Sequence, residues 1–142
     1  MKLIIAGSRH LDPRLVYMAI EFALRDRYQI DEVVSGRASR GTDKVGEQWA
    51  LDHGIPVRPF PADWKKFGLS AGHIRNAAMA DYGDHLLLVW DGKSRGSRGM
   101  KECMIKRGKP YEEVILQNTT PASGSARLDG MDTESFSRGL GL

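Results

Sequence analysis

Short runs of consecutive apolar residues recur along the first 116 residues of the chain. Residues 3–6, 33–34 and 86–90 are continuously apolar rather than alternating, which is typical of strands covered on both faces. The run at 86–90 is the most apolar of these and predicts the central strand of a sheet. Residues 55–60 contain two prolines, which places a third strand at an edge. Residues 111–116 predict the last strand.

Amphipathic segments separate the apolar runs. Asp12 and Pro13 supply an N-cap and a first helical residue, and apolar side chains follow at helical spacing. Further helical spacing predicts helices that end at Gly54, extend over residues 71–82 and end at Gly108. Strict alternation of strand and helix predicts an α/β fold, a three-layer sandwich in which helices cover both faces of a parallel sheet of about five strands.

Three stretches differ from this pattern. Residues 61–71 predict a polar connection, and residues 91–99 predict a loop rich in glycine, serine and arginine. Residues 117–142 are rich in glycine, serine and threonine and have no apolar periodicity, so we expect a flexible tail. The predicted organisation is one domain over residues 1–116 followed by this tail.

Composition narrows the class of protein. The 142 residues carry a net charge of +3, and 41% are hydrophobic, as in ordinary globular proteins. Cys103 is the single cysteine, which excludes an internal disulfide and favours a reducing compartment. The N-terminal apolar run is shorter than a signal peptide or a membrane span requires. We therefore expect a cytoplasmic protein that does not associate with membranes.

Glycine, serine and arginine gather where three of the predicted strands end. They occur in residues 7–9 after the first strand, 35–43 after the second and 91–98 after the fourth. Ligands bind beyond the carboxyl ends of strands in parallel sheets. Glycines let backbone N–H groups approach a ligand, helix N-termini favour anions, and guanidinium groups bind phosphate. The pattern predicts a phosphate or nucleotide pocket.

Other chemistry finds little support. The four histidines are scattered without the spacing of a metal site, so no metal is expected. The P-loop pattern, the Gly-x-Ser-x-Gly elbow and the dinucleotide fingerprint are absent. Turn formation, helix capping, packing and solvation are the alternative roles of the glycines, aspartates, Trp64 and loop arginines. Pairing with Asp81 or Asp84 is the alternative for Arg75.

Four blocks in residues 34–97 resemble the YspA-like branch of the SLOG superfamily, named for the Smf/DprA and LOG proteins. The blocks are residues 34–36 with 41–43, residues 60–64, residues 72–76 with Met79, and residues 90–97. The resemblance implies a Rossmann-like fold, a bound nucleotide or nucleotide-derived ligand such as an ADP-ribose-like molecule, and a homo-oligomer. The expected ligand-binding residues are Gly7, Ser8, Arg9, Ser35, Gly36, Arg37, Gly41, Thr42, Asp43, Trp64, Arg75, Asn76, Asp91, Gly92, Ser94, Gly96 and Ser97.

The LOG enzymes of this superfamily cleave the base from a nucleoside monophosphate with a signature resembling Gly-Gly-x-Gly-Thr-x-x-Glu. Here Gly96 and Ser97 stand at the Gly-Thr positions, and Met100 stands at the glutamate. A thioether does not replace a carboxylate in this chemistry. Binding or sensing without hydrolysis is therefore favoured, and no catalytic residue is assigned.

Two alternatives stay open. A nucleotide hydrolase would need another carboxylate, such as Asp43 or Asp91. Single-stranded DNA binding is the third possibility, but the chain lacks a basic stripe with interleaved aromatic residues. Nucleic acid is therefore not the expected partner.

Overall fold

The computed structural model describes residues 1–117, in which strands and helices alternate. The elements are β1 (Lys2–Gly7), α1 (Pro13–Leu24), β2 (Glu32–Ser35), α2 (Thr42–Asp52), β3 (Val57–Pro59), α3 (Trp64–Phe67), the 3-10 turn η1 (Gly68–Ser70), α4 (Ala71–Tyr82), β4 (His85–Trp90), α5 (Arg95–Lys106) and β5 (Tyr111–Ile115). The expected tail at 117–142 lies outside the described residues except for Gln117. No helix in residues 1–117 is both long enough and apolar enough to cross a membrane.

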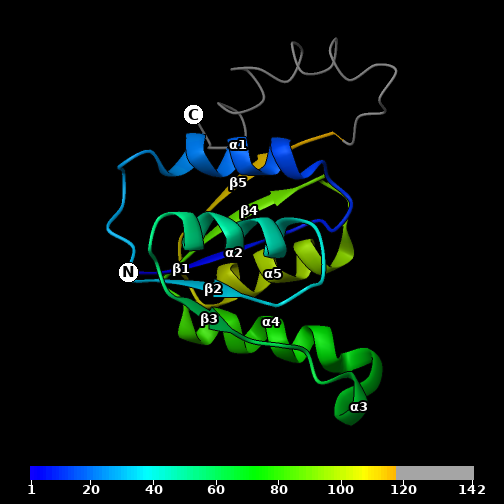
Figure 1. The fold of residues 1–142 in the computed structure, drawn as a ribbon. Helices are drawn as coiled ribbons and strands as arrows, with labels where there is room; N and C mark the ends of the chain where they lie inside the picture. Colours follow the sequence, from blue (N-terminus) through cyan, green and yellow to red (C-terminus); the bar gives the residue numbers. More distant parts are fainter. Residues whose placement is uncertain (118–142) are drawn as a thin grey trace.

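All five strands are parallel and lie in the order β3-β2-β1-β4-β5 (Figure 1). Ile4 in β1 pairs with Val34 on one side and with Leu86 on the other. The chain builds outward from β1 to β3 and then returns to place β4 on the other side of β1. The switch point of the sheet therefore lies between β1 and β4, where ligands bind in folds of this kind.

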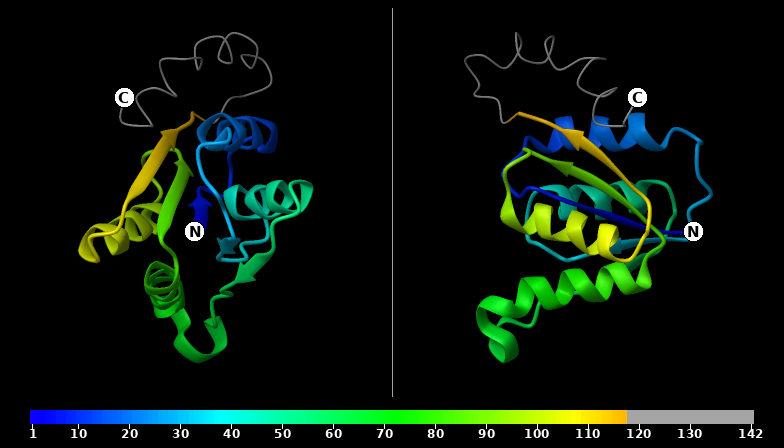
Figure 2. Two further views of the ribbon diagram at one scale, coloured as in Figure 1. Left: turned by 90° about the vertical axis from the view of Figure 1, so that its left-hand side faces the viewer. Right: turned by 180° about the vertical axis from the view of Figure 1, so that it is seen from behind.

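Helices cover both faces of the sheet, with α1 and α2 on one side and α4 and α5 on the other (Figure 2). Alternate residues of β1 point into two separate hydrophobic clusters. Leu3 and Ile5 lie in the cluster under α1 and α2, whereas Ile4 and Ala6 lie in the cluster under α4 and α5. Burial on both faces explains the continuous apolar run, and the predicted three-layer α/β fold is confirmed.

The structure corrects three details. β1 holds the middle of the sheet, and β4 lies beside it, because an apolar run reports burial on both faces and not rank in the sheet. The connection 61–71 contains α3 and η1, since Asp63 Oδ1 accepts a hydrogen bond from Lys66 N at 3.0 Å and caps a short helix. The loop after β4 ends at Ser94, which caps α5, so Arg95 already lies in the first helical turn.

His85 lies at the end of the sheet opposite to the switch point. Its ionisation makes the stability of the fold depend on pH. Its Nε2 lies 3.4 Å from Glu112 Oε1, and its side chain is only 12% exposed. Burial lowers the pKa of His85 below its ordinary value of 6.5, and the neighbouring Glu112 opposes this only in part. The folded state therefore holds His85 neutral.

We expect acid to weaken the fold through His85. As pH falls below about 6.5, the unfolded chain binds a proton more readily than the folded chain, so the free energy of unfolding decreases until pH passes the lowered pKa. Urea unfolding at about pH 7.5 and pH 5.5 measures this loss, which His85→Gln is expected to reduce. The exposed His73 provides the control, since His73→Gln should keep the wild-type loss. An equal loss in His85→Gln would contradict the assignment.

Candidate functional site

A cavity of about 360 Å³ opens at the carboxyl ends of the strands, around the switch point. The loops after β1, β2 and β4 all contribute to it, together with α4 and α5. Its lining consists of Ala6, Gly7, Arg9 and His10 from β1 and its loop, Ala38, Arg40 and Asp43 from the next loop and α2, Arg75, Asn76 and Met79 from α4, and Ser94, Gly96, Ser97 and Met100 from the β4 loop and α5.

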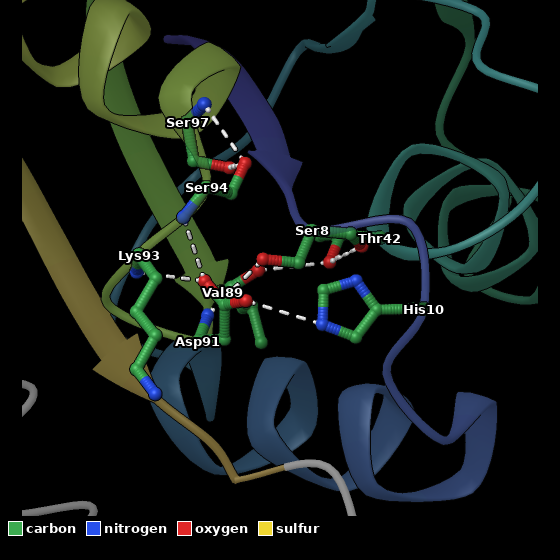
Figure 3. Close-up of polar contacts among 8 residues, drawn as sticks. All are labelled: Ser8, His10, Thr42, Val89, Asp91, Lys93, Ser94 and Ser97. Atoms are coloured by element: carbon green, nitrogen blue, oxygen red, sulfur yellow. Dashed lines mark hydrogen bonds and ion pairs between the residues drawn. The ribbon is translucent and has the colours of Figure 1, made fainter.

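The cavity exists because β1, β4 and α2 meet at one carbonyl group. Val89 O accepts hydrogen bonds from Ser8 N at 3.2 Å and from Thr42 Oγ1 at 2.9 Å (Figure 3). A Cβ atom on Gly7 would lie 1.6 Å from the same oxygen, so only glycine fits there. Gly41, with φ +79°, brings the start of α2 against Ser8 and Arg9. Three loops are thus held around a common point.

Asp91 shapes the loop between β4 and α5. Its Oδ1 accepts hydrogen bonds from Lys93 N at 2.8 Å and Ser94 N at 2.9 Å, and its own N–H donates to Ser8 Oγ (Figure 3). Burial tends to raise the pKa of Asp91, but the two N–H groups and His10 outweigh it, so the pKa is lowered. Asp91 therefore stays ionised and holds the loop that presents Ser94 and the N-terminus of α5 to the cavity.

Arg75 and Asn76 connect α4 to both neighbouring walls. Arg75 Nη1 donates to Gly36 O at 2.6 Å, and its Nε donates to Asn76 Oδ1 at 2.9 Å. Asn76 Nδ2 donates to Gly96 O at 3.2 Å. A Cβ atom on Gly36 would lie 2.6 Å from Arg75 Nη1, so any larger residue would require the Arg75 guanidinium to shift.

Burial has the largest effect on the pKa of Arg75. It lowers the pKa of this guanidinium, and the nearby Asp43 opposes the effect. Asp81 and Asp84 do not hold Arg75. Asp81 binds Arg107 and Asp84 accepts from Lys2 N.

Asp43 is the only carboxylate among the cavity-lining residues of the described chain. It lies in the first turn of α2, is 7% exposed and accepts a hydrogen bond from Ala38 N at 3.1 Å. Burial raises the pKa of Asp43, whereas the Ala38 N–H and the charges of Arg75 and Arg9 act to lower it. Three arginines, at positions 9, 40 and 75, also line the cavity, so its charge favours an anion.

Some expected residues face elsewhere. Arg37 has φ +64° and forms an ion pair with Glu47 at 2.9 Å. Ser35 Oγ donates to the same carboxylate at 2.6 Å. Trp64 lies on α3, is 52% exposed and does not line the cavity. Of the expected set, Gly7, Arg9, Asp43, Arg75, Asn76, Ser94, Gly96 and Ser97 line the cavity, whereas Ser8, Ser35, Gly36, Arg37, Gly41, Thr42, Trp64, Asp91 and Gly92 do not.

The structure adds lining residues that the expected set lacks. Arg40 and His10 lie next to residues of the expected set, Arg40 before Gly41 and His10 after Arg9, so proximity along the chain was the available signal. Ala6, Met79 and Met100 form apolar parts of the wall. The sequence does not identify them, because apolar residues in such segments are expected in the hydrophobic core. Within residues 1–117, no three His, Cys, Asp or Glu side chains are placed to hold a metal ion together.

Known proteins share part of this sequence. The profile of the YspA, cpYpsA-related SLOG family matches residues 1–67. Gene 61 protein of Mycobacterium phage D29 is 33% identical over 122 residues, which cover 80% of this chain and 94% of the phage protein. The chain belongs to the YspA, cpYpsA-related SLOG family, and this membership indicates a nucleotide-related role.

One solved structure shows a distant likeness to the chain. It is a phosphoribosylglycinamide formyltransferase from Coxiella burnetii in complex with CHES, at a TM-score of 0.43 and 15% identity. The match covers 94% of this chain, which spans 61% of the formyltransferase chain.

Proposed function

We propose that the protein binds or senses a nucleotide, a phosphorylated ribonucleotide or an ADP-ribose-like molecule, in the cavity at the switch point. The observation that carries the proposal is the charge of the lining: Arg9, Arg40 and Arg75 surround a space in which Asp43 is the only acidic side chain of the described residues. Guanidinium groups are suited to phosphate because their planar donors match its oxygens.

The N-terminus of α5 supplies a second attraction for phosphate. Ser94 caps this helix of 12 residues, and its first turn contains no acidic residue. The first turn of α2, by contrast, contains Asp43. Asp91 accepts the N–H groups of Lys93 and Ser94 ahead of the helix, and Ser94 Oγ accepts that of Ser97. Within the described residues the N–H groups of Arg95 and Gly96 have no such partner, an arrangement that favours a bound anion.

The remaining surface suits a sugar and a base. Ala6, Met79 and Met100 give the wall an apolar part, and ligand pockets commonly combine such surface with a few polar groups. The cavity of about 360 Å³ lies near the lower end of the range of roughly 300–1,000 Å³ for small-molecule sites. The size favours a mononucleotide or one half of a larger ligand.

Substitutions of two arginines in one loop test which guanidinium group binds phosphate. Arg40→Gln is expected to weaken binding of AMP or ADP-ribose about tenfold or more, since a hydrogen bond to a charged group contributes roughly 1.5–3 kcal/mol. Arg37→Gln is the matched control and should change affinity less than about twofold, because Glu47 holds Arg37 outside the cavity. Titration calorimetry measures both. Equal losses would contradict the arrangement, and no binding by the wild type would overturn the proposal.

Gly96 allows a carboxylate to be placed at the N-terminus of α5. Beyond its own chain neighbours and helix backbone, a Cβ atom on Gly96 would meet no atom within 4 Å, so Gly96→Asp and Gly96→Ala should both fold. The aspartate should stabilise α5 by about 0.3–1 kcal/mol through the helix dipole and weaken nucleotide binding more than about tenfold by repelling phosphate. The alanine variant should retain binding. Thermal unfolding and calorimetry check the pair, and unchanged binding in Gly96→Asp would place the phosphate elsewhere.

Cleavage of an N-glycosidic bond is a second candidate function, and the position of Asp43 favours it. Met100 lines the cavity where the resemblance to LOG enzymes implies a glutamate, but Asp43 supplies a buried carboxylate from another helix. A carboxylate beside the sugar stabilises developing positive charge during such cleavage.

A hydrolase of this type should release adenine from AMP. Asp43→Asn is expected to lower the rate at least about a hundredfold through loss of the carboxylate. Asp63→Asn, which changes only the cap of α3, should keep the wild-type rate. Chromatography of the products measures adenine. Bound AMP that stays intact in the wild type would exclude the hydrolase and leave binding in place.

A further inference from the structure

His10 lines the cavity and is held at one edge of its ring. Its Nε2 lies 3.1 Å from Asp91 Oδ2, while the other carboxylate oxygen of Asp91 accepts two backbone N–H groups (Figure 3). The carboxylate is thus fixed from both sides. An ionised carboxylate at Nε2 requires a proton on that nitrogen, so Nδ1 is the ring nitrogen that remains for a ligand.

Nδ1 belongs to a ring that lines the cavity and is partly open to solvent. The side chain of His10 is 48% exposed, and within residues 1–117 no hydrogen bond to Nδ1 is found. In a neutral ring with the proton on Nε2, Nδ1 only accepts a hydrogen bond, and an unprotonated phosphate oxygen has none to donate. A second proton converts Nδ1 to a donor that binds phosphate with a full charge.

Charged groups of both signs surround His10. Asp91 contacts the ring from the β4 loop, and Asp43 lines the same cavity from α2. Arg9 in the same loop, Arg40 before α2 and Arg75 in α4 also line it. A bound phosphate adds negative charge to this set and shifts the balance toward the protonated ring.

We propose that His10 is an anion-binding residue that takes up a proton from solvent when phosphate enters the cavity. The proposal rests on the proposed nucleotide site and adds a coupling between ligand affinity and pH. His10, positioned by Asp91, makes the site prefer its ligand at lower pH.

ADP-ribose is the appropriate probe, because its two phosphates are both esterified and do not titrate near neutral pH. A proton taken up on binding must then come to the protein. Calorimetry in two buffers of different ionisation enthalpy counts the protons per ligand. The wild type is expected to take up a measurable fraction of a proton near pH 7, and its affinity should fall about tenfold between about pH 6 and pH 8.

His10→Gln removes the titrating ring and should abolish the proton uptake, with an affinity that changes less than about twofold over the same range. His73→Gln, at an exposed histidine that does not line the cavity, should keep the wild-type coupling. Zero uptake in the wild type, or equal uptake in His10→Gln, would overturn the proposal.

An NMR titration separates failure of this proposal from failure of the nucleotide site. Histidine ring spectra of the ligand-free protein should show the His10 signal, identified by its loss in His10→Gln, as the neutral form with the proton on Nε2. Sulfate, an oxyanion that does not titrate near neutral pH, should move the His10 protonation curve to higher pH than chloride of equal ionic strength, with no effect on His73. No such shift, or a proton on Nδ1 of the neutral ring, would overturn the role of His10 even if nucleotides bind. A shift without binding of any nucleotide would instead leave His10 in place and reject the nucleotide.

Discussion

The contact between the carboxyl ends of β1 and β4 is the constraint on which the site depends. Gly7 approaches Val89 so closely that a side chain at Gly7 would overlap the Val89 carbonyl oxygen, which also accepts a hydrogen bond from Thr42 at the start of α2. Because three elements meet at this oxygen, the loops that follow β1 and β4 and the loop that precedes α2 are held at one edge of the sheet. The sheet order places this contact at its switch point, so fold and site have a common origin.

The polar groups in and around the cavity divide into supports and a surface left for a ligand. Asp91, Ser8 and Thr42 lie behind the lining and form hydrogen bonds with backbone groups of the surrounding loops. Arg75 is partly committed in the same way, since Gly36 and Asn76 hold its guanidinium. Rigid support of this kind preorganises a binding site. Three arginines and one aspartate line the cavity. A bound anion would compensate the remaining positive charge.

The sequence predicts the fold well because its evidence is local and repeated. β1 is apolar at every core position since both of its faces are buried, and the cap Asp12 defines where α1 begins. The start of α5 is missed, because the glycines and serines of residues 91–99 indicate a loop although Ser94 caps the helix. The site is predicted less completely. The carboxyl ends of parallel strands lie at one edge of the sheet, so the sequence identifies the loops that form the site. The direction of each side chain, however, depends on partners elsewhere in the chain. Arg37 and Arg40 lie in one loop, and only the sequence-distant Glu47, together with the positive φ of Arg37, directs Arg37 away from the cavity.

The distribution of charge within the cavity bears on binding versus catalysis. α5 offers backbone N–H groups, but the thioether of Met100 follows them on the same helix and is buried. A phosphate held at this helix would therefore have apolar surface next to it, and the nearest chemistry capable of accepting a proton would come from Asp43 on α2 or His10 in the β1 loop. Asp43 is already engaged by Ala38 N and close to Arg75, whereas Nδ1 of His10 has no such commitment within the described chain. These positions support the proposed binding of phosphate, with His10 as the group that takes up a proton, more than they support cleavage of a glycosidic bond.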